Sequence, residues 1–519
     1  MFLPKAGSKL AWLIFYVSLG IILTLNSFSY LDPDFGWHLR VGERIALEHS
    51  VPHDQIYMWS LAGKNWVDHE WLGNLATYGL WEFGGYTAVS IFFILLPLFG
   101  LIILNRYVFT NYLKRKFHQS VFAGLELFAL IACLPHFGVR LQEFTFVFTI
   151  LLFIIIDSCC RKQNIKAAYW LLPLLFLWSC IHGGFLFSIA ATLGWLAYEI
   201  ILKLFPLIKN FLNEQALDNK NLKKLIFISL AAILLTLATP YGKELYSFLN
   251  DYGQNRYYMS HIEEWRTPYS IPFVYWQILY TQVIIVLFFG AQAYLKNKIP
   301  LWKTVLSLGL LILASRSVRH FPLWAVGSLL LIVPSTIRLN LESAKVVYGK
   351  YLNTLAIFCF FLIVATTGIQ AKFNNNPFTN YCQRYPCGAV QFLKANPQYG
   401  NLKMFNDYGW GGFLIWVWPE KKIFIDGRLP QYDFKNKTLL EEYTSFFDKD
   451  KIEEKFNEYD IKLVLFKTSE APFQPDWLEQ LITGEKPSER KNPLIEYLKS
   501  SPNWKSVYSD STASVYIKK

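Results

Sequence analysis

Two aspartates near the start of the chain have the spacing that acid–base or metal chemistry uses. Asp32 and Asp34 are separated by one proline and follow the first apolar run directly. Two carboxylates this close could hold a divalent cation such as Mg²⁺ or Mn²⁺, or one of them could take a proton from a hydroxyl group. The motif would also serve as a membrane-surface turn, because Asp-Pro starts turns and nearby Tyr30 and Trp37 are interface residue types.

Other charged residues stand close to the apolar runs. His38 and Glu70 follow the aspartates and fit contacts to a metal or to an acceptor, and Glu264 fits the same roles further along the chain. Arg316 and Arg319 interrupt an apolar stretch, where an arginine costs on the order of 3 kcal/mol on insertion scales. We therefore expect these two arginines to bind an anionic headgroup such as a phosphate. Snorkelling at a short loop is the alternative.

Three further motifs combine a polar side chain with glycines. His182-Gly183-Gly184 fits either a substrate contact or a packed turn. Asp407-Tyr408-Gly409 and Asp426-Gly427-Arg428 lie in the last third of the chain and are candidates for binding an acceptor. Ligands bind α/β sheets at the carboxyl ends of strands, and glycine lets a backbone come close to a partner. A tight structural turn would use the same residues.

The composition indicates that these residues are positioned by a membrane domain. The chain has 519 residues, of which 53% are hydrophobic and 17% charged, whereas about a quarter of the residues in a soluble chain are charged. Disorder, a coiled coil and a collagen-like fibre are excluded. Apolar runs that could cross about 30 Å of hydrocarbon recur along the chain. We predict about eleven spans, at 10–29, 84–105, 119–135, 144–158, 167–181, 185–203, 224–240, 274–295, 302–315, 321–337 and 351–369.

The distribution of charge predicts the orientation. The formal net charge is +12; residues 371–519 contain 21 Lys and Arg against 19 Asp and Glu, whereas residues 1–370 contain 29 against 19. Most of the basic residues of the apolar part lie in alternate connections, which the positive-inside rule places in the cytoplasm. The N-terminus is then cytoplasmic, and the long connections 30–83 and 241–273 and the C-terminal residues are outside. The basic charge therefore indicates topology, and we expect no nucleic-acid partner.

Residues 371–519 are predicted to form a soluble α/β domain outside the membrane, after the transmembrane domain 1–370. We expect strands at 402–406, 412–417, 422–426, 462–466 and 513–517 and helices at 387–396, 437–446, 450–458 and 474–483, because strands alternate there with helical patterns. An oxidising compartment would allow a disulfide between Cys382 and Cys387, and the sequence leaves this open.

The candidate acids and arginines all map to the outer side, an arrangement that fits a lipid-linked substrate. Over nearly its whole length the chain resembles the C-type (GT-C) membrane glycosyltransferases, which transfer sugars from polyprenyl-phosphate carriers at the outer face. The resemblance rests on Asp32-Pro33-Asp34, Trp37-His38, Glu70-Trp71-Leu72, His182-Gly183-Gly184, Pro240-Tyr241-Gly242, Glu264-Trp265, Arg316 and Arg319. A weaker similarity links Asp32-Pro33-Asp34-Phe35 and Asp407-Tyr408-Gly409 to oligosaccharyltransferase catalytic subunits, although Phe405-Asn406 replaces their tryptophan pair.

The resemblance implies an inverting glycosyltransferase in the bacterial cytoplasmic membrane with a polyprenyl-phosphate-linked sugar as donor. Asp34 or Asp32 would be the general base or hold the metal, and no other cofactor is expected. Arg316 and Arg319 would hold the carrier phosphate. The acceptor could be a protein, lipid A or a polymer. The alternative is a lipid-linked glycan transporter or a non-catalytic protein of envelope glycan assembly, which would tolerate the loss of Asp34.

Overall fold

The structure is a computed structural model that describes residues 6–29, 31–162, 165–212, 214–270, 275–294, 299–340, 381–474, 480, 484 and 486–519. The chain forms two compact units, each assembled from segments far apart in the sequence. The first contains 1–27, 90–243 and 263–373, and the second contains 28–89, 244–262 and 374–519. The predicted domain boundary at residue 370 lies outside the described residues and stays a prediction.

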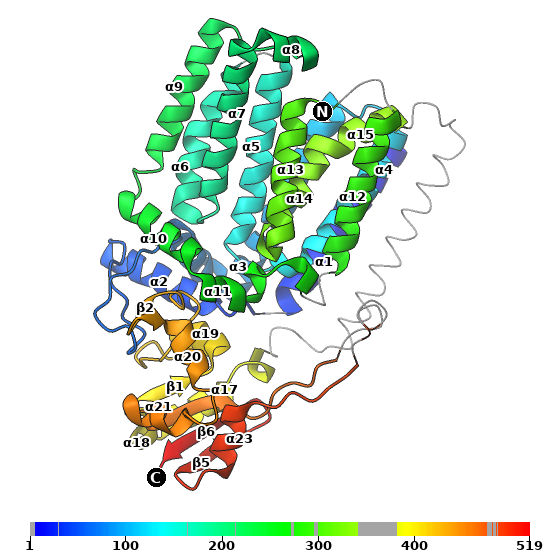
Figure 1. The fold of residues 1–519 in the computed structure, drawn as a ribbon. Coiled ribbons are helices and arrows are strands. Elements are labelled where there is room, and N and C mark those ends of the chain that lie inside the picture. Colours follow the sequence, from blue (N-terminus) through cyan, green and yellow to red (C-terminus); the bar gives the residue numbers. More distant parts are fainter. Residues whose placement is uncertain are drawn as a thin grey trace. The chain divides into compact units, whose positions relative to one another are not determined.

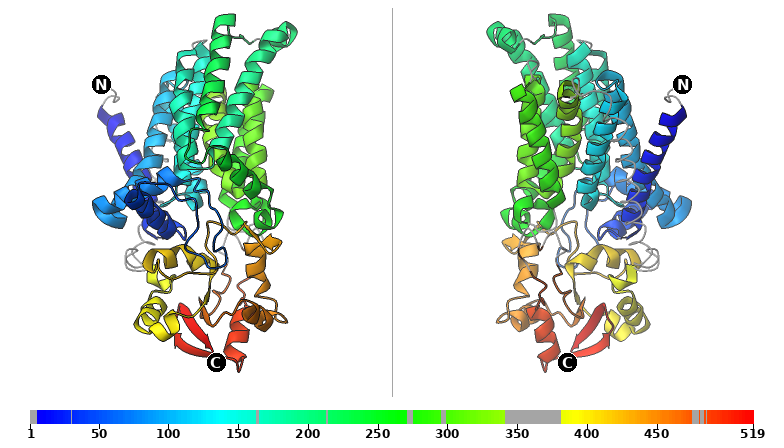
Figure 2. Two further views of the ribbon diagram at one scale, coloured as in Figure 1. Left: turned by 90° about the vertical axis from the view of Figure 1, so that its left-hand side faces the viewer. Right: turned by 90° about the vertical axis from the view of Figure 1, so that its right-hand side faces the viewer.

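The first unit is helical, and its long helices run side by side (Figures 1 and 2). The helices of this unit, long and short, are α1 (Ala6–Ser29), the second part of α3 (Trp71–Asn111), α4 (Lys116–Cys133), α5 (Gln142–Lys162), α6 (Leu171–Ile181), α7 (Phe185–Leu204), α8 (Pro206–Leu212), α9 (Asn219–Leu235), α12 (Tyr275–Tyr294), α13 (Leu301–Arg316), α14 (Phe321–Gly327) and α15 (Val333–Asn340). A π-helical turn, Ser328–Ile332, joins α14 to α15.

The helices of the first unit agree with the predicted spans. Each predicted span from 10–29 to 321–337 overlaps a helix, and 351–369 lies outside the described residues. Five helical segments of the described chain are long and apolar enough to cross a membrane, and three shorter apolar helices accompany them. The chain is therefore a multi-pass membrane protein. The number of eleven spans stays a prediction.

Small residues bring these helices together, as they do in membrane proteins generally. A Cβ on Gly327 in α14 would collide with Leu310 of α13, and one on Gly100 in α3 would lie 3.1 Å from Ile150 of α5. Helix α3 is broken at Gly84 and Gly85, and Gly85 has φ of 62°, a conformation that glycine adopts without strain.

The second unit is the α/β part. Its strands are β1 (Met404–Asn406), β2 (Asp433–Phe434), β3 (Lys437–Thr438), β4 (Leu463–Lys467), β5 (Trp504–Ser509) and β6 (Ala513–Lys518). Its helices are α2 (Phe35–Glu48), the start of α3, α10 (Lys243–Gln254), α11 (Arg256–His261), α17 (Cys387–Ala395), α18 (Pro397–Gly400), α19 (Gly411–Val417), α20 (Leu439–Ser445), α21 (Ile452–Glu458) and α23 (Pro493–Ser500). The main sheet has the order β1-β4-β6-β5, with β1 and β4 parallel and the other pairs antiparallel.

The sequence located most of these elements but misassigned two segments. The predicted strand 412–417 is wrong, because these residues form helix α19; a short apolar run has no period that separates strand from helix. The predicted strand 422–426 is not a regular strand either: Ile423 alone forms a β-bridge, to Met58 of the first loop, and Phe424 lies in a bend. Strand β5 and helix α23 were not predicted. Most of the predicted helix 474–483 lies outside the described residues.

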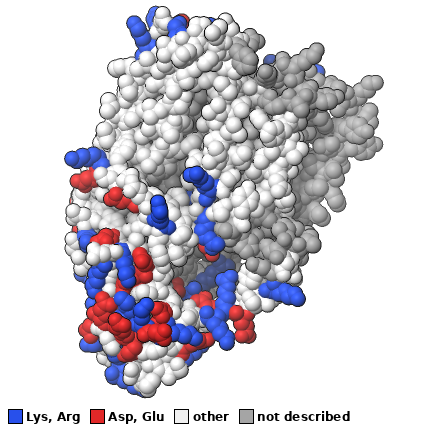
Figure 3. Space-filling model, viewed as in Figure 1, with Lys and Arg blue, Asp and Glu red and all other residues white. Residues whose placement is uncertain are grey.

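The two units differ in surface charge. On the face seen in Figure 3, the helices of the first unit present mainly uncharged side chains, with basic ones gathered near one end of the bundle. The C-terminal residues of the second unit present a dense mixture of Lys, Arg, Asp and Glu. This is the contrast expected between a lipid-facing and a water-facing surface.

Candidate functional site

The acidic motif forms the N-terminal end of α2. Asp32 is buried, and its Oδ1 accepts a hydrogen bond from the backbone N–H of Asp34 at 2.8 Å. Asp34 is the N-cap residue of α2, is partly exposed, and accepts a hydrogen bond from Trp37 Nε1 at 2.9 Å on its Oδ1. A carboxylate is favourable at this end of a helix. Of the two aspartates, Asp34 is the one that a reactant can reach more easily.

Three glycines allow the C-terminal residues of the second unit to pack against this motif. A Cβ on Gly412 would collide with the backbone O of Pro33, and one on Gly36 would collide with the backbone O of Gly412. A Cβ on Gly427 would collide with Asp34 Oδ1 itself. Gly427 of the predicted acceptor motif, together with Gly36 and Gly412, thus admits a close approach to Asp34 and its neighbours.

Asn406 holds the segment that carries Gly427. Its side chain is fully buried at the end of β1; Oδ1 accepts from the backbone N–H of Phe424 at 2.8 Å, and Nδ2 donates to the backbone O of Ile425 at 2.9 Å. The amide therefore replaces the ladder hydrogen bonds that a neighbouring strand would provide. Here the chain departs from the oligosaccharyltransferase motif, and the replacement residue fixes the turn that follows.

Asp426 and Arg428 bind each other within that turn. Arg428 Nη2 donates to Asp426 Oδ2 at 2.6 Å, and both side chains are at most 1% exposed. The guanidinium also lies near the rings of Tyr57 and Trp66, at 5.0 and 4.7 Å from their centroids. Arg428 Nη1 has no hydrogen-bond partner among the described residues. This pair rigidifies the turn beside Asp34, and its predicted contact with an acceptor stays a prediction.

His38 is held by a buried network of hydrogen bonds that the sequence did not indicate. Asn74 Nδ2 donates to both oxygens of Asp68, at 2.9 and 2.8 Å, so that Asn74 Oδ1 is left to face His38 Nδ1 at 2.6 Å. An amide oxygen accepts, so His38 Nδ1 must carry the proton and Nε2 must be the acceptor. Asp68 and Asn74 thereby select the tautomer of His38.

Burial shifts the pKa values of the ionisable groups in this hydrogen-bonded network. It lowers the pKa of His38 to about 4, although the hydrogen bond to Asn74 and the charge of Asp32 oppose the shift. Burial raises the pKa of Asp68 to about 6, against the hydrogen bonds from Asn74 and from the backbone of Glu70. Near neutral pH, His38 is therefore neutral and Asp68 is mostly ionised. Glu70 is buried beside this network, and its Oε1 lies 3.8 Å from His69 Nε2.

The other acceptor candidates are held in a turn of their own. Asp407 is buried, and its Oδ1 accepts from the backbone N–H of Gly409 at 2.9 Å. Burial raises the pKa of Asp407, and the charge of Lys467 opposes this shift. The backbone N–H of Tyr408 donates to Tyr443 Oη at 3.2 Å. These contacts shape the link between β1 and α19.

A cluster in the first unit contains one of the two predicted phosphate-binding arginines. Arg140 Nη1 donates to Glu264 Oε1 at 2.7 Å, and Arg319 Nη1 donates to Glu264 Oε2 at 3.0 Å. Burial would raise the pKa of Glu264, but Arg140 and Arg319 outweigh it and lower the pKa to about 2. Arg319 also lies over the Trp265 ring, at 5.1 Å. Arg316 is exposed at the end of α13 and has no ion pair among the described residues.

Glu264 therefore pairs with Arg140 and Arg319 and is not part of a cluster of acidic side chains among the described residues. Two guanidinium groups and one carboxylate leave the cluster with a net charge of about +1, which suits an anion. The sequence did not predict that Arg140 and Arg319 share Glu264 as a partner, because these two residues are 179 positions apart and no local pattern relates them.

His182 organises the turn between α6 and α7. Its Nδ1 accepts from the backbone N–H of Gly184 at 3.0 Å, and Thr145 Oγ1 lies 2.8 Å away. Trp178 Nε1 donates to that hydroxyl at 2.9 Å. A Cβ on Gly184 would come within 2.5 Å of Thr145 Oγ1. These contacts give His182 a structural role in the turn, and its predicted contact with substrate stays a prediction.

The oxygen and nitrogen donors near the acidic motif determine whether a metal ion fits there. No group of three or more His, Cys, Asp or Glu side chains in the described part of the chain is arranged to hold a metal ion. Asp32 and Asp34 each have one oxygen that accepts a hydrogen bond from the protein. The described side chains thus do not form a multi-ligand cage, and Asp32 and Asp34 are the pair of carboxylates that would hold a cation.

The fold is similar to that of an enzyme family. No protein-family model and no curated protein sequence matches the chain. A solved structure of the oligosaccharyltransferase AglB from Archaeoglobus fulgidus, in complex with an inhibitory peptide and a dolichol-phosphate, matches with a TM-score of 0.50 and 10% identity over 90% of this chain and 70% of that chain. A second structure of an oligosaccharyltransferase from this organism, tethered to an acceptor peptide, matches with a TM-score of 0.46 and 12% identity over 97% and 74%. The first match shows a distant similarity in fold to oligosaccharyltransferases of the GT-C type.

Proposed function

We propose that this protein is a membrane glycosyltransferase that moves a sugar from a polyprenyl-phosphate-linked donor to an acceptor at the outer face of the bacterial cytoplasmic membrane. The observation that carries the proposal is Asp34, partly exposed at the start of α2 and packed against Gly427, on a fold similar to that of an oligosaccharyltransferase. That solved protein is bound to a dolichol-phosphate, which is a polyprenyl phosphate. The N-terminus would be cytoplasmic, and the C-terminal residues would lie outside.

Asp34 would act as the general base. Its carboxylate takes the proton of the acceptor nucleophile while the lone pair of that nucleophile forms a bond to the anomeric carbon. The bond from this carbon to the carrier phosphate breaks, and the phosphate leaves with the electron pair. Attack opposite the leaving group inverts the anomeric configuration. A positioned base contributes about 10²–10⁴ in rate.

His38 and the arginines would bind the reactants. His38 Nε2 has no hydrogen-bond partner among the described residues and is an acceptor in the tautomer that Asn74 imposes, so it can accept a hydrogen bond from a sugar or acceptor hydroxyl. Arg319, held with Arg140 by Glu264, would bind the carrier phosphate, with Arg316 as an exposed third cation. If a divalent cation binds, Asp32 and Asp34 would hold it, and it would neutralise charge on the leaving phosphate.

The experiment that tests this proposal uses the protein in detergent, where no membrane separates an inner side from an outer side. A deletion strain should accumulate the donor, and its envelope should lack the product. The purified protein in detergent is mixed with a lipid extract of that strain and with its delipidated envelope fraction, and the products are examined by mass spectrometry. A glycosyltransferase should add the mass of one sugar to an acceptor, which identifies both substrates. A transporter makes no covalent bond, so an unchanged acceptor would overturn the proposal.

A further inference from the structure

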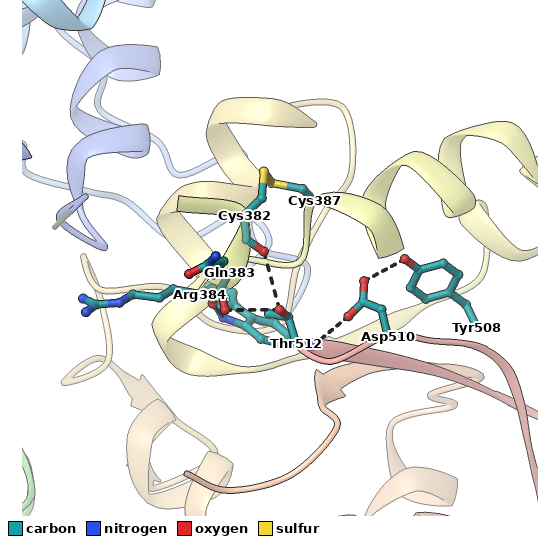
Figure 4. The surroundings of a disulfide bond; sticks show 8 residues. Cys382, Gln383, Arg384, Cys387, Tyr508, Asp510 and Thr512 are labelled. Atoms are coloured by element: carbon teal, nitrogen blue, oxygen red, sulfur yellow. Dashed lines mark hydrogen bonds between the residues drawn. A yellow bond between two sulfur atoms is a disulfide. The ribbon is translucent and has the colours of Figure 1, made fainter. Parts of the chain in front are cut away.

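A disulfide closes a short loop in the second unit. Cys382 and Cys387 are bonded, with their Cα atoms 5.3 Å apart, which resolves the pairing that the sequence left open. The loop contains Arg384 and Tyr385 and leads into α17. In Figure 4 the hydroxyl of Thr512 points to the loop, and it donates to the backbone O of Gln383 at 3.2 Å. The loop is thus fastened to the connection between β5 and β6.

The same loop contacts the segment that packs on the acidic motif. Trp410 Nε1 donates to the backbone O of Arg384 at 2.9 Å, and the Trp410 side chain is buried. Trp410 directly precedes Gly411 and Gly412, and Gly412 is the residue whose Cα lies against the backbone O of Pro33. One side of the loop therefore supports the approach to Pro33.

Tyr385 connects the other side of the loop to the acidic motif. Its ring is buried and stacks on Phe413 of α19, with the centroids 4.9 Å apart. Its hydroxyl donates to the backbone O of Leu31 at 2.8 Å, and Leu31 directly precedes Asp32. The disulfide-closed loop thus makes one direct and one indirect contact with the residues around Asp34.

We propose that the loop 382–387 is a positioning element for Asp34, with Tyr385 as the positioning residue, so that the oxidation state of Cys382 and Cys387 sets the rate of sugar transfer. The inference rests on the proposed function. A dithiol reductant would deliver two electrons and two protons to the disulfide, become a cyclic disulfide itself and leave two thiols. The open loop would hold Tyr385 and the Arg384 carbonyl less firmly. A displacement of the base by about 1 Å can cost about 10²-fold in rate.

Hydrogen exchange tests this inference without any sugar transfer. The backbone N–H groups of Asp34, Phe35 and His38 are hydrogen-bonded within the acidic motif and the start of α2, so their exchange reports local opening. We expect dithiothreitol to speed the exchange of a peptide covering residues 31–38 at least threefold in the purified full-length protein. The variant Tyr385→Phe should show the same increase while oxidised. Unchanged exchange in both samples would overturn the inference.

Two controls separate a local effect from unfolding. The Tyr399 hydroxyl lies in the same unit and makes no hydrogen bond among the described residues. Its removal in Tyr399→Phe should leave the exchange of residues 31–38 unchanged. Peptides of β4 should exchange equally in all samples, because a general loss of fold would speed them too. An increase in β4 of the same size as in residues 31–38 would contradict a positioning role.

A kinetic measurement then distinguishes the two proposals. Tyr385→Phe should lower kcat about threefold to tenfold and leave the KM for the lipid donor unchanged, and Tyr399→Phe should change neither. If no variant and no wild-type sample transfers sugar, the proposed function fails, and the exchange result still decides the role of the loop. If transfer is normal in the reduced protein and in Tyr385→Phe, the inference alone fails.

Discussion

Glu264 and Asp34 are both carboxylates in segments that the charge pattern assigns to the outside, yet their surroundings differ. Glu264 lies between two arginines that keep it ionised, with its pKa at about 2. Asp34 accepts a hydrogen bond from the neutral indole of Trp37 and lies against a glycine. A carboxylate bound by two guanidinium groups is a poor base, because the two cations stabilise its ionised form. The comparison therefore argues against Glu264 as a base and gives it the role of fixing the arginines, while Asp34 is the residue that we propose as the base.

Replacing Gly427 by alanine should have the largest effect on the Asp34 side of this comparison. The new methyl group would collide with Asp34 Oδ1, so the carboxylate or the turn must move. We expect kcat for sugar transfer to fall about 10–100-fold, because misplacement of a catalytic group by about 1 Å costs up to about 10²-fold. Gly79→Ala is the control, since a Cβ at Gly79 meets nothing within 4 Å. Equal activity of the two variants would show that the contact with Gly427 does not position the base.

Removing an arginine should change donor binding and leave proton transfer intact. Arg319→Gln deletes one of the two cations on Glu264, and the loss of a hydrogen bond to a charged group costs about 1.5–3 kcal/mol. We expect the KM for the lipid donor to rise about tenfold with kcat within about threefold of wild type, measured by initial rates in detergent. Lys505→Gln, an exposed residue of β5, controls for the change in charge. A fall in kcat at constant KM would assign Arg319 to the chemical step.

The two regions should respond to acid with opposite signs. Because the pKa of Asp68 is raised to about 6, its ionisation opposes folding above pH 6, and this cost disappears as the pH falls to about 4. Relative to Asp68→Asn, the wild type should gain about 2 kcal/mol between pH 6 and pH 4. Because the pKa of Glu264 is lowered to about 2, the wild type should lose stability relative to Glu264→Gln as the pH falls from about 4.5 to 2.

Thermal unfolding in detergent checks both signs. The Tm difference between wild type and Asp68→Asn should shift by a few degrees in favour of the wild type between pH 7 and pH 4. His38, with its pKa at about 4, is present in both proteins, so its protonation is common to the two sides of the comparison. The difference between wild type and Glu264→Gln should be constant from pH 7 to pH 5 and should shift against the wild type as the pH falls from about 4.5 to 2. A Tm difference that is independent of pH in both pairs would contradict the assigned charges.

Chelation should have the smallest effect. The described residues supply no group of three metal-binding side chains, and we expect Asp34 to act as a base. Sugar transfer in excess EDTA should therefore remain within about twofold of the untreated rate. Loss of transfer that Mg²⁺ or Mn²⁺ restores would show instead that Asp32 and Asp34 hold a metal.

The sequence predicted those features that depend on local patterns. Apolar runs located the helices of the first unit, and the spacing of Asp32 and Asp34 identified the acidic motif. It could not predict contacts between distant segments, such as Arg140 with Arg319 or Gly427 with Asp34, because no periodicity relates such positions. The role of Asn406 was hidden for a related reason. A buried amide that replaces a strand partner looks, in the sequence, like any polar residue at the end of a strand.

The most direct test of the central claim is the activity of Asp34→Asn. Asparagine keeps the size of the side chain and can still accept from Trp37, but it cannot take a proton. The deletion strain is complemented with wild type, Asp34→Asn or Asp251→Asn, the last an exposed acid in α10, and envelope glycolipids and glycoproteins are compared by mass spectrometry at equal protein levels. We predict that the product returns with wild type and Asp251→Asn and stays missing with Asp34→Asn. A full product profile with Asp34→Asn would contradict the assignment of Asp34 as the base and would favour transport or assembly.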